Sequence, residues 1–228
     1  LLVQQIKMFN DVLFHPNVRN GKFDEQTFAI KKKELKERLI VQNDDKFMSW
    51  KDDLLELKRQ ERWMDIIVFC EQQIQKDNNS ADSYIQTIYL THDILLEENP
   101  TPLEAQEAQR LLILTFLDGQ QRHMDNAEYL FFVGSLIPVA EWLFGLKETN
   151  KEPKEQLGCK MLYQATLIEP YNMLYKWSYM DYYGDPQSKQ LAQNILSDQV
   201  VVSYLRRQGC AGEYMLDILG VASTWVDD

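Results

Sequence analysis

Apolar residues recur with helical spacing along most of the chain after residue 49. Trp63, Ile67, Cys70 and Ile74 lie at i, i+4, i+7 and i+11, the spacing of one face of an α-helix. A polar break, KDNNSADS, follows, and a second apolar face runs over residues 84–95. Because the break is short, it predicts a tight turn between two antiparallel neighbouring helices.

Helix start signals support the same pattern further along the chain. Thr101, Pro102 and Glu104 fit N-cap, first and third helical positions, so they predict a capping box with proline where it needs no N–H. Asp125 with Glu128 predicts the start of the next helix in the same way. Further helices are predicted around residues 154–168, 171–183, 187–198 and 213–225. Only VVVSYL, residues 200–205, has the composition of a strand.

Residues 129–146, YLFFVGSLIPVAEWLFGL, form an 18-residue stretch that is almost wholly apolar. This length is close to the minimum for a membrane span. Pro138 and Glu141 lie inside this stretch, and no basic cluster flanks it. These features favour a helix buried by neighbouring helices, and we expect no membrane association. The first residues, LLVQQIKMFND, do not have the pattern of a secretory signal.

Composition and charge limit the fold class and the kinds of partner that the protein could bind. The chain has 228 residues, 45% of them hydrophobic, with only 9 Gly and 7 Pro, which favours an all-α fold with long helices. Residues 1–48 hold nine basic and seven acidic residues, whereas the remainder holds 15 basic and 28 acidic, a balance of −13. Such a surface repels phosphate backbones, so no nucleic acid is expected, and it suits a basic protein or peptide partner. The alternative is that the acidic residues only keep the protein soluble.

Reactive residue types are few and scattered. Cys70, Cys159 and Cys210 lie far apart without a zinc-binding spacing, which fits a reducing compartment and predicts a cytoplasmic location. The sequence has no dinucleotide-binding or P-loop motif and no calcium loop, so no cofactor or metal is expected.

The three histidines are His15, His92 and His123. His92 lies on the apolar side of its predicted helix and could be a ligand or a base, but a hydrogen-bonded core histidine is the commoner role. His123 and Asp125 have no serine or cysteine nucleophile at a matching spacing. We therefore predict no catalytic residue.

Aromatic residues crowd into residues 171–183, YNMLYKWSYMDYY, and on one helix they cannot all face one core. Tyrosines on a groove give amphipathic contact area at low entropy cost. We predict that Tyr171, Tyr175, Tyr179 and Tyr182 bind a partner. The alternative is that helices on both sides bury them.

Two helix junctions resemble tetratricopeptide repeats. ERWMDIIVFCEQQIQKDNNS has Trp63 at an aromatic position of that repeat, and YQATLIEPYNMLYKW has a helix end followed by Glu169-Pro170. The usual glycine is absent, and Asp77 and Glu169 are 92 residues apart, which is not a multiple of the 34-residue period. The resemblance implies a degenerate array of stacked antiparallel helix pairs over residues 49–228.

Residues 1–48 carry a different resemblance. LFHP, GKFDE, KKKELKERL and DDKF are similar to a helical segment of the M16, insulinase-like peptidases. That family's zinc helix carries His-x-x-Glu-His, which this sequence does not contain, so no catalytic residue can be assigned from the resemblance.

Two functional hypotheses follow. The first is a helical-repeat module that binds a protein or peptide, for instance an immunity-type inhibitor of a basic partner. The second is a non-catalytic fragment or half of an M16-type zinc metallopeptidase.

Overall fold

The computed structural model describes residues 50–96, 98–146 and 155–224 of the chain. The chain divides into two units, residues 1–40 and 41–228, and all described residues belong to the second. The predicted boundary at residue 48 and the M16 resemblance lie outside the described residues.

The described part of the chain is built from α-helices and two short 3₁₀ helices, with no strand among the described residues. This confirms the predicted all-α class. The elements in chain order are α3 (Trp50–Arg59), α4 (Trp63–Lys76), α5 (Ala81–Leu96), α6 (Pro102–Arg122), α7 (Ala127–Leu136), η2 (Ile137–Val139), η3 (Glu141–Phe144), α8 (Leu157–Ile168), α9 (Met173–Tyr182), α10 (Gln187–Ser197), α11 (Gln199–Arg207) and α12 (Gly209–Thr224).

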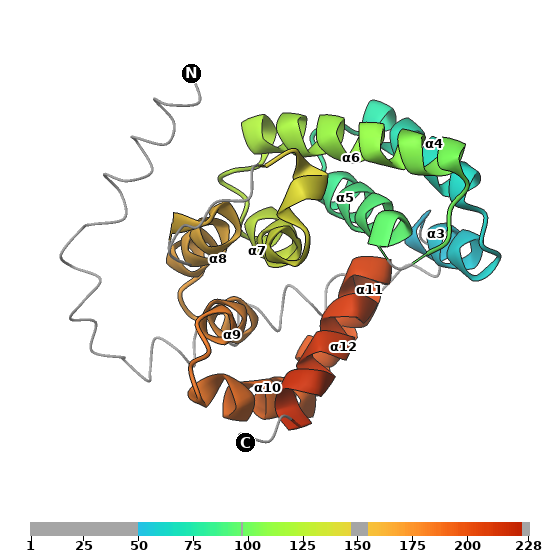
Figure 1. The fold of residues 1–228 in the computed structure, drawn as a ribbon. Helices are drawn as coiled ribbons and strands as arrows, with labels where there is room; N and C mark the ends of the chain where they lie inside the picture. The colour runs from blue at the N-terminus through green and yellow to red at the C-terminus, as the bar shows by residue number, and fades with distance from the viewer. Residues whose placement is uncertain (1–49, 97, 147–154, 225–228) are drawn as a thin grey trace. The chain divides into compact units, whose positions relative to one another are not determined.

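Consecutive helices pack in pairs, most extensively α5 with α6 and α7 with α8 (Figure 1). The helices α5, α7 and α9 also contact one another in succession, as do α4 and α6. Helix α12 then returns to the first helices and packs on α3 and α5. Packing by pairs is consistent with a helical array, and the return of α12 covers part of α5 with the protein's own chain.

Local capping signals define the starts of two central helices. Thr101 caps α6: its hydroxyl accepts from the backbone N of Glu104 at 3.4 Å, and the Glu104 carboxylate accepts from the backbone N of Thr101 at 2.8 Å. The predicted capping box is therefore confirmed. Helix α7 is capped by Asn126, which accepts from the backbone N of Tyr129 at 2.8 Å. The predicted cap at Asp125 is thus wrong by one residue.

The apolar stretch 129–146 does not form one buried helix. Helix α7 ends at Leu136, and Pro138 lies in the 3₁₀ turn η2 that follows. Proline has no backbone N–H to continue the helix, and its ring clashes with the preceding turn. The break turns Trp142 outward, 54% exposed, while Leu143 and Phe144 stay buried.

The sequence VVVSYL forms a helix that the periodicity did not predict. Asp198 ends α10 and caps α11, where its carboxylate accepts from the backbone N of Val200 at 3.0 Å. Val202 and Leu205 face the core. A cap and a buried face therefore outweigh the strand preference of the valines, as tertiary packing commonly does.

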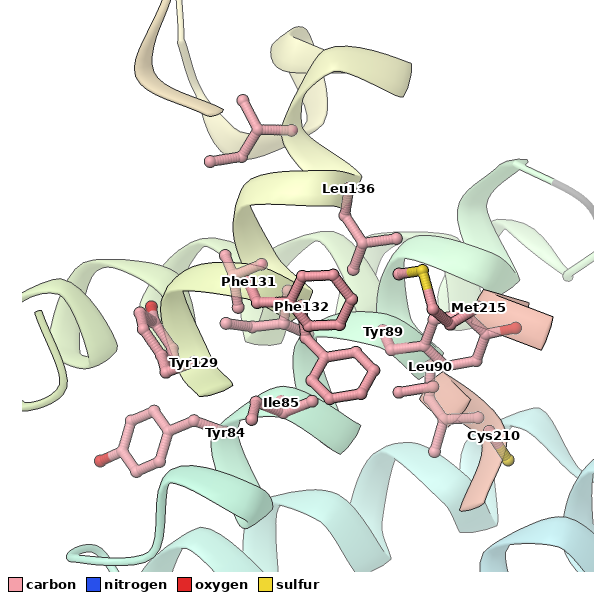
Figure 2. Packing of buried hydrophobic residues seen from close by; sticks show 14 of the residues in the cluster. Tyr84, Ile85, Tyr89, Leu90, Tyr129, Phe131, Phe132, Leu136, Cys210 and Met215 are labelled. Carbon is pink, nitrogen blue, oxygen red and sulfur yellow. The ribbon is translucent and has the colours of Figure 1, made fainter. Parts of the chain in front are cut away.

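One hydrophobic core joins α5, α7 and α12. Figure 2 shows Phe131 and Phe132 of α7, Leu90 of α5 and Met215 of α12 in one cluster of buried side chains. The Phe131 and Phe132 rings meet edge to face, with centroids 4.8 Å apart. Since α12 contributes to this core, it is an integral part of the fold.

Candidate functional site

A cluster of tyrosines lies where α8 and α9 pack together, and we call it the tyrosine face: Tyr163, Tyr179, Tyr182 and Tyr183. Ring centroids are 5.3 Å apart for Tyr163 and Tyr179, 5.0 Å for Tyr179 and Tyr183, and 6.0 Å for Tyr182 and Tyr183. Tyr183 is 43% exposed, and the other three are partly buried. These rings form a connected aromatic surface that solvent reaches.

Polar contacts fix the orientation of this face. The Tyr182 hydroxyl donates to the side-chain oxygen of Gln156, just before α8. The Cys159 thiol donates to the Tyr183 hydroxyl at 3.1 Å. Burial, with Cys159 and Glu141 nearby, raises the pKa of Tyr182 to about 12, so this hydroxyl remains neutral near neutral pH. The tyrosine face therefore offers oriented neutral rings.

The structure separates the four tyrosines predicted to bind a partner. Tyr179 and Tyr182 belong to the tyrosine face, and Tyr171 lies in the turn before α9, partly buried. Tyr175 is only 3% exposed and packs on Phe131 of α7, with ring centroids 4.9 Å apart. Tyr175 is therefore a core residue and cannot contact a partner in this structure.

Sequence reasoning missed the contribution of Tyr163. It lies on α8 and joins the face only because α8 packs on α9. Tyr183 was visible in the same tyrosine-rich stretch but falls just after the helix end, where helical spacing no longer places it.

Charged residues of both signs lie near the tyrosine face, either in space or in sequence. Glu141 is close enough to Tyr182 to raise its pKa, and Asp181 and Asp185 flank the tyrosines in sequence. Lys160 on α8 lies near Cys159, and Lys176 precedes Tyr179 by one helical turn. The local balance is slightly acidic, in keeping with the −13 balance of residues 49–228.

Apart from the tyrosine face, a group of polar side chains lies where α11 and the start of α12 meet α3, α5 and α7. We call it the polar interface: Lys51, Asp82, Gln86, Glu128, Tyr204 and Gln208.

Lys51 of α3 connects three elements of this interface. Its Nζ lies 2.9 Å from Asp82 Oδ2 of α5 and donates to Gln208 Oε1 at 2.9 Å. It also donates to the backbone oxygen of Arg207 at 3.3 Å, at the C-terminal end of α11. A cation is favoured there by the unpaired carbonyl groups and by the helix dipole. Lys51 therefore holds the end of α11 against α3 and α5.

Two further hydrogen bonds cross the polar interface. Gln86 of α5 donates through Nε2 to the backbone oxygen of Gln208. The Tyr204 hydroxyl of α11 donates to the carboxyl group of Glu128 on α7, 76 residues earlier in the chain. The polar interface therefore links helices far apart in sequence.

His92 and His123 are both buried, at 4% and 6% exposure, and each has an Nε2 atom without a hydrogen-bond partner. His92 lies near the Phe144 ring, and His123 lies between Tyr84 and Tyr129. Burial lowers the pKa of both side chains, so both are neutral near neutral pH. The burial of His92 confirms its predicted place in the core, whereas the hydrogen bond expected there is not found at its Nε2 atom.

Burial lowers the pKa of His92 to about 4, with Asp93 opposing the shift. An unfolded histidine titrates near 6.5, so between these two values the unfolded state binds the extra proton and folding loses stability as pH falls. We expect that loss to be on the order of 2–3 kcal/mol for His92. His92→Leu should remove this component of the pH dependence, as measured by urea unfolding near neutral pH and at roughly pH 4.5. Equal loss of stability in the wild type and the variant over that range would contradict this assignment.

Within the described ranges, no three His, Cys, Asp or Glu side chains gather so as to hold a metal ion. None of the described helices combines the length and apolar character that crossing a membrane requires. Comparisons with known protein families, curated proteins and solved structures give no match to this chain.

Proposed function

We propose that this protein is an all-helical module that binds a basic protein or peptide through the tyrosine face. The observation that carries this proposal is the solvent-accessible cluster of four tyrosines across α8 and α9. Tyrosine combines a large apolar ring with a polar hydroxyl, which is why it is enriched in binding surfaces.

The chemistry of the partner follows from the rings and from the charge. The faces of aromatic rings attract lysine and arginine cations within about 6 Å. Glu141 lies near Tyr182, and Asp181 and Asp185 flank Tyr182 and Tyr183 in sequence. The wider acidic surface would steer a basic partner toward the protein, and salt would screen that attraction. An inhibitor that masks a basic toxin is one form of this function.

Helices α5 and α7 are a less suitable binding surface in this structure, because the C-terminal helices contact them. Helix α12 packs on α5, and Tyr204 of α11 bonds to α7. A peptide that used this face would first have to displace α11 and α12. We therefore place binding on α8 and α9.

Tyr183→Ala should weaken partner binding by about 1–2 kcal/mol, or roughly ten-fold, because it removes the most exposed ring of the tyrosine face. The partner is first identified by affinity capture from the source cell with the immobilised wild-type protein. Its dissociation constant is then measured by calorimetry for the wild type and for Tyr183→Ala, at low ionic strength and at about 0.5 M salt.

Leu103→Ala is the matched control, since Leu103 is 61% exposed on α6, and the other described α-helices that pack on α8 and α9 are α7 and α10. It should leave affinity unchanged. Circular dichroism verifies that both variants are folded. Equal affinity of Tyr183→Ala and Leu103→Ala would refute the assignment to the tyrosine face, and an affinity that salt does not alter would refute the basic partner.

We also propose a cytoplasmic location. It is supported by Cys70, Cys159 and Cys210, which are all free and buried, as is common in a reducing compartment.

A further inference from the structure

The outward side of α6 carries apolar side chains that the other described residues leave exposed. Leu103, Leu114 and Leu117 are 61%, 52% and 46% exposed. Their spacing puts them on one side of the helix, and the core residues Leu112 and Phe116 lie on the other. The outer side of a surface helix ordinarily holds polar residues, so a row of exposed leucines there indicates a contact surface.

Helix α4 extends this apolar surface. It packs beside α6 (Figure 1), and Arg110 of α6 forms an ion pair with Glu71 of α4 at 3.1 Å. Val68, 45% exposed, lies about one turn before Glu71. Four of the nine large hydrophobic side chains exposed in the described residues therefore belong to these two helices. We call this surface the α4–α6 face: Val68, Glu71, Leu103, Glu107, Arg110, Leu114 and Leu117.

The charges of the α4–α6 face have both signs and compensate one another. Arg110 Nε lies 2.8 Å from a carboxylate oxygen of Glu107, and the same guanidinium pairs with Glu71. Further along α6, Arg122 pairs with Asp118 at 2.8 Å. A basic partner would have to compete with these arginines for the carboxylates, so the charges do not favour it here.

We propose that two copies of this protein associate through the α4–α6 face as a two-fold symmetric dimer. In such a dimer the face meets its own copy, so a face with a single sign of charge would repel itself. The α4–α6 face has both signs, so the arginine of one copy approaches carboxylates of the other.

The positions of the leucines fit the same symmetry. Leu103 and Leu117 each lie seven residues from Arg110. A two-fold axis near Arg110, with the α6 helices antiparallel, therefore brings Leu103 of one copy against Leu117 of the other, twice. Each Arg110 brings Glu71 and Glu107 with it to the axis, which offsets the repulsion between the two arginines.

The size of the α4–α6 face suits a weak, reversible dimer. Helix α6 has 21 residues and α4 has 14, so they are about 31 and 21 Å long and each about 10 Å wide. About 500 Å² of each copy would be covered, or about 1,000 Å² in all, the low end for a specific interface. The tyrosine face belongs to α8 and α9, so the dimer does not require it.

Sedimentation velocity of the full chain, from about 1 to about 200 μM, tests the dimer. The wild type should pass from monomer to dimer over this range. Leu114→Glu should raise the dimer dissociation constant by about ten-fold or more, because it places a charge in the apolar contact. Val221→Glu is the matched control: it adds the same charge at a side chain that is 59% exposed on α12, and it should dimerise like the wild type. Circular dichroism verifies that both variants are folded.

Disulfide trapping tests the antiparallel arrangement. In an equimolar mixture of Leu103→Cys and Leu117→Cys, mild oxidation should link the two variants to each other faster than either variant to itself. The natural cysteines are buried and do not compete. A wild type that stays monomeric to about 200 μM would overturn the proposal, and the face would then be covered by another segment or another protein. Equal dimerisation of Leu114→Glu and Val221→Glu, or faster linkage of identical variants, would overturn it as well.

Discussion

Trp63→Ala should lower the free energy of unfolding by about 3–5 kcal/mol, the range for truncating a large buried aromatic side chain. Trp63 is the first residue of α4 and is only 7% exposed. It belongs to the main hydrophobic core together with Ile66, Ile67 and Cys70 of the same helix. Alanine would leave a cavity where α4 packs on its neighbours α3 and α5. Chemical denaturation monitored by circular dichroism at 222 nm, roughly the helical minimum, measures the change.

Trp142→Ala is the matched control for this prediction. The same side chain is deleted, but Trp142 is 54% exposed in the 3₁₀ helix η3. Surface substitutions of this kind usually change stability by less than about 0.5 kcal/mol. If the two tryptophan variants lost equal stability, burial would not be what makes Trp63 important.

Local signals were enough to predict much of the helical framework. The break after Lys76 and the Thr101–Glu104 box depend on residues close in sequence, and both are found where expected. The break of the apolar stretch at Pro138 was also readable, since proline ends helices, but overall apolarity concealed it.

Features created by packing could not be predicted. The spacing of Tyr175 and Tyr179 puts them on one side of an isolated helix. Tyr175 nevertheless meets Phe131 of α7, while Tyr179 meets Tyr163 of α8. Which part of a helix surface is covered depends on the neighbouring helices, and the sequence of α9 does not contain that information.

The polar interface shows even more clearly that contacts between distant residues cannot be predicted from local sequence. Glu128 was interpreted only as part of a helix start, and Tyr204 lay in a segment with strand-like composition. The two meet because α11 returns across α7, 76 residues later in the chain. No motif of local spacing could have joined them.

Gly212→Ala should destabilise the protein by about 3 kcal/mol, because it places a methyl group where the backbones of α11 and α12 meet. A Cβ atom on Gly212 would lie 1.8 Å from the carbonyl oxygen of Leu205 and 2.7 Å from its carbonyl carbon. These are backbone atoms of a residue that is fully buried, so no side-chain rotation relieves the clash. Helix α12 would have to move away from α11, which also strains the neighbouring Tyr204 and Gln208 contacts.

Gly220→Ala makes the same chemical change on the same helix, but we expect the opposite effect on the free energy of unfolding. A Cβ atom on Gly220 meets nothing within 4 Å, and alanine is more favourable than glycine inside a helix by up to about 1 kcal/mol. Gly220→Ala should therefore raise the free energy of unfolding, by about 0.5–1 kcal/mol, while Gly212→Ala lowers it. Urea unfolding of the two variants beside the wild type measures both values. A Gly212→Ala protein as stable as Gly220→Ala would mean that α11 and α12 are not in backbone contact at Leu205 and Gly212.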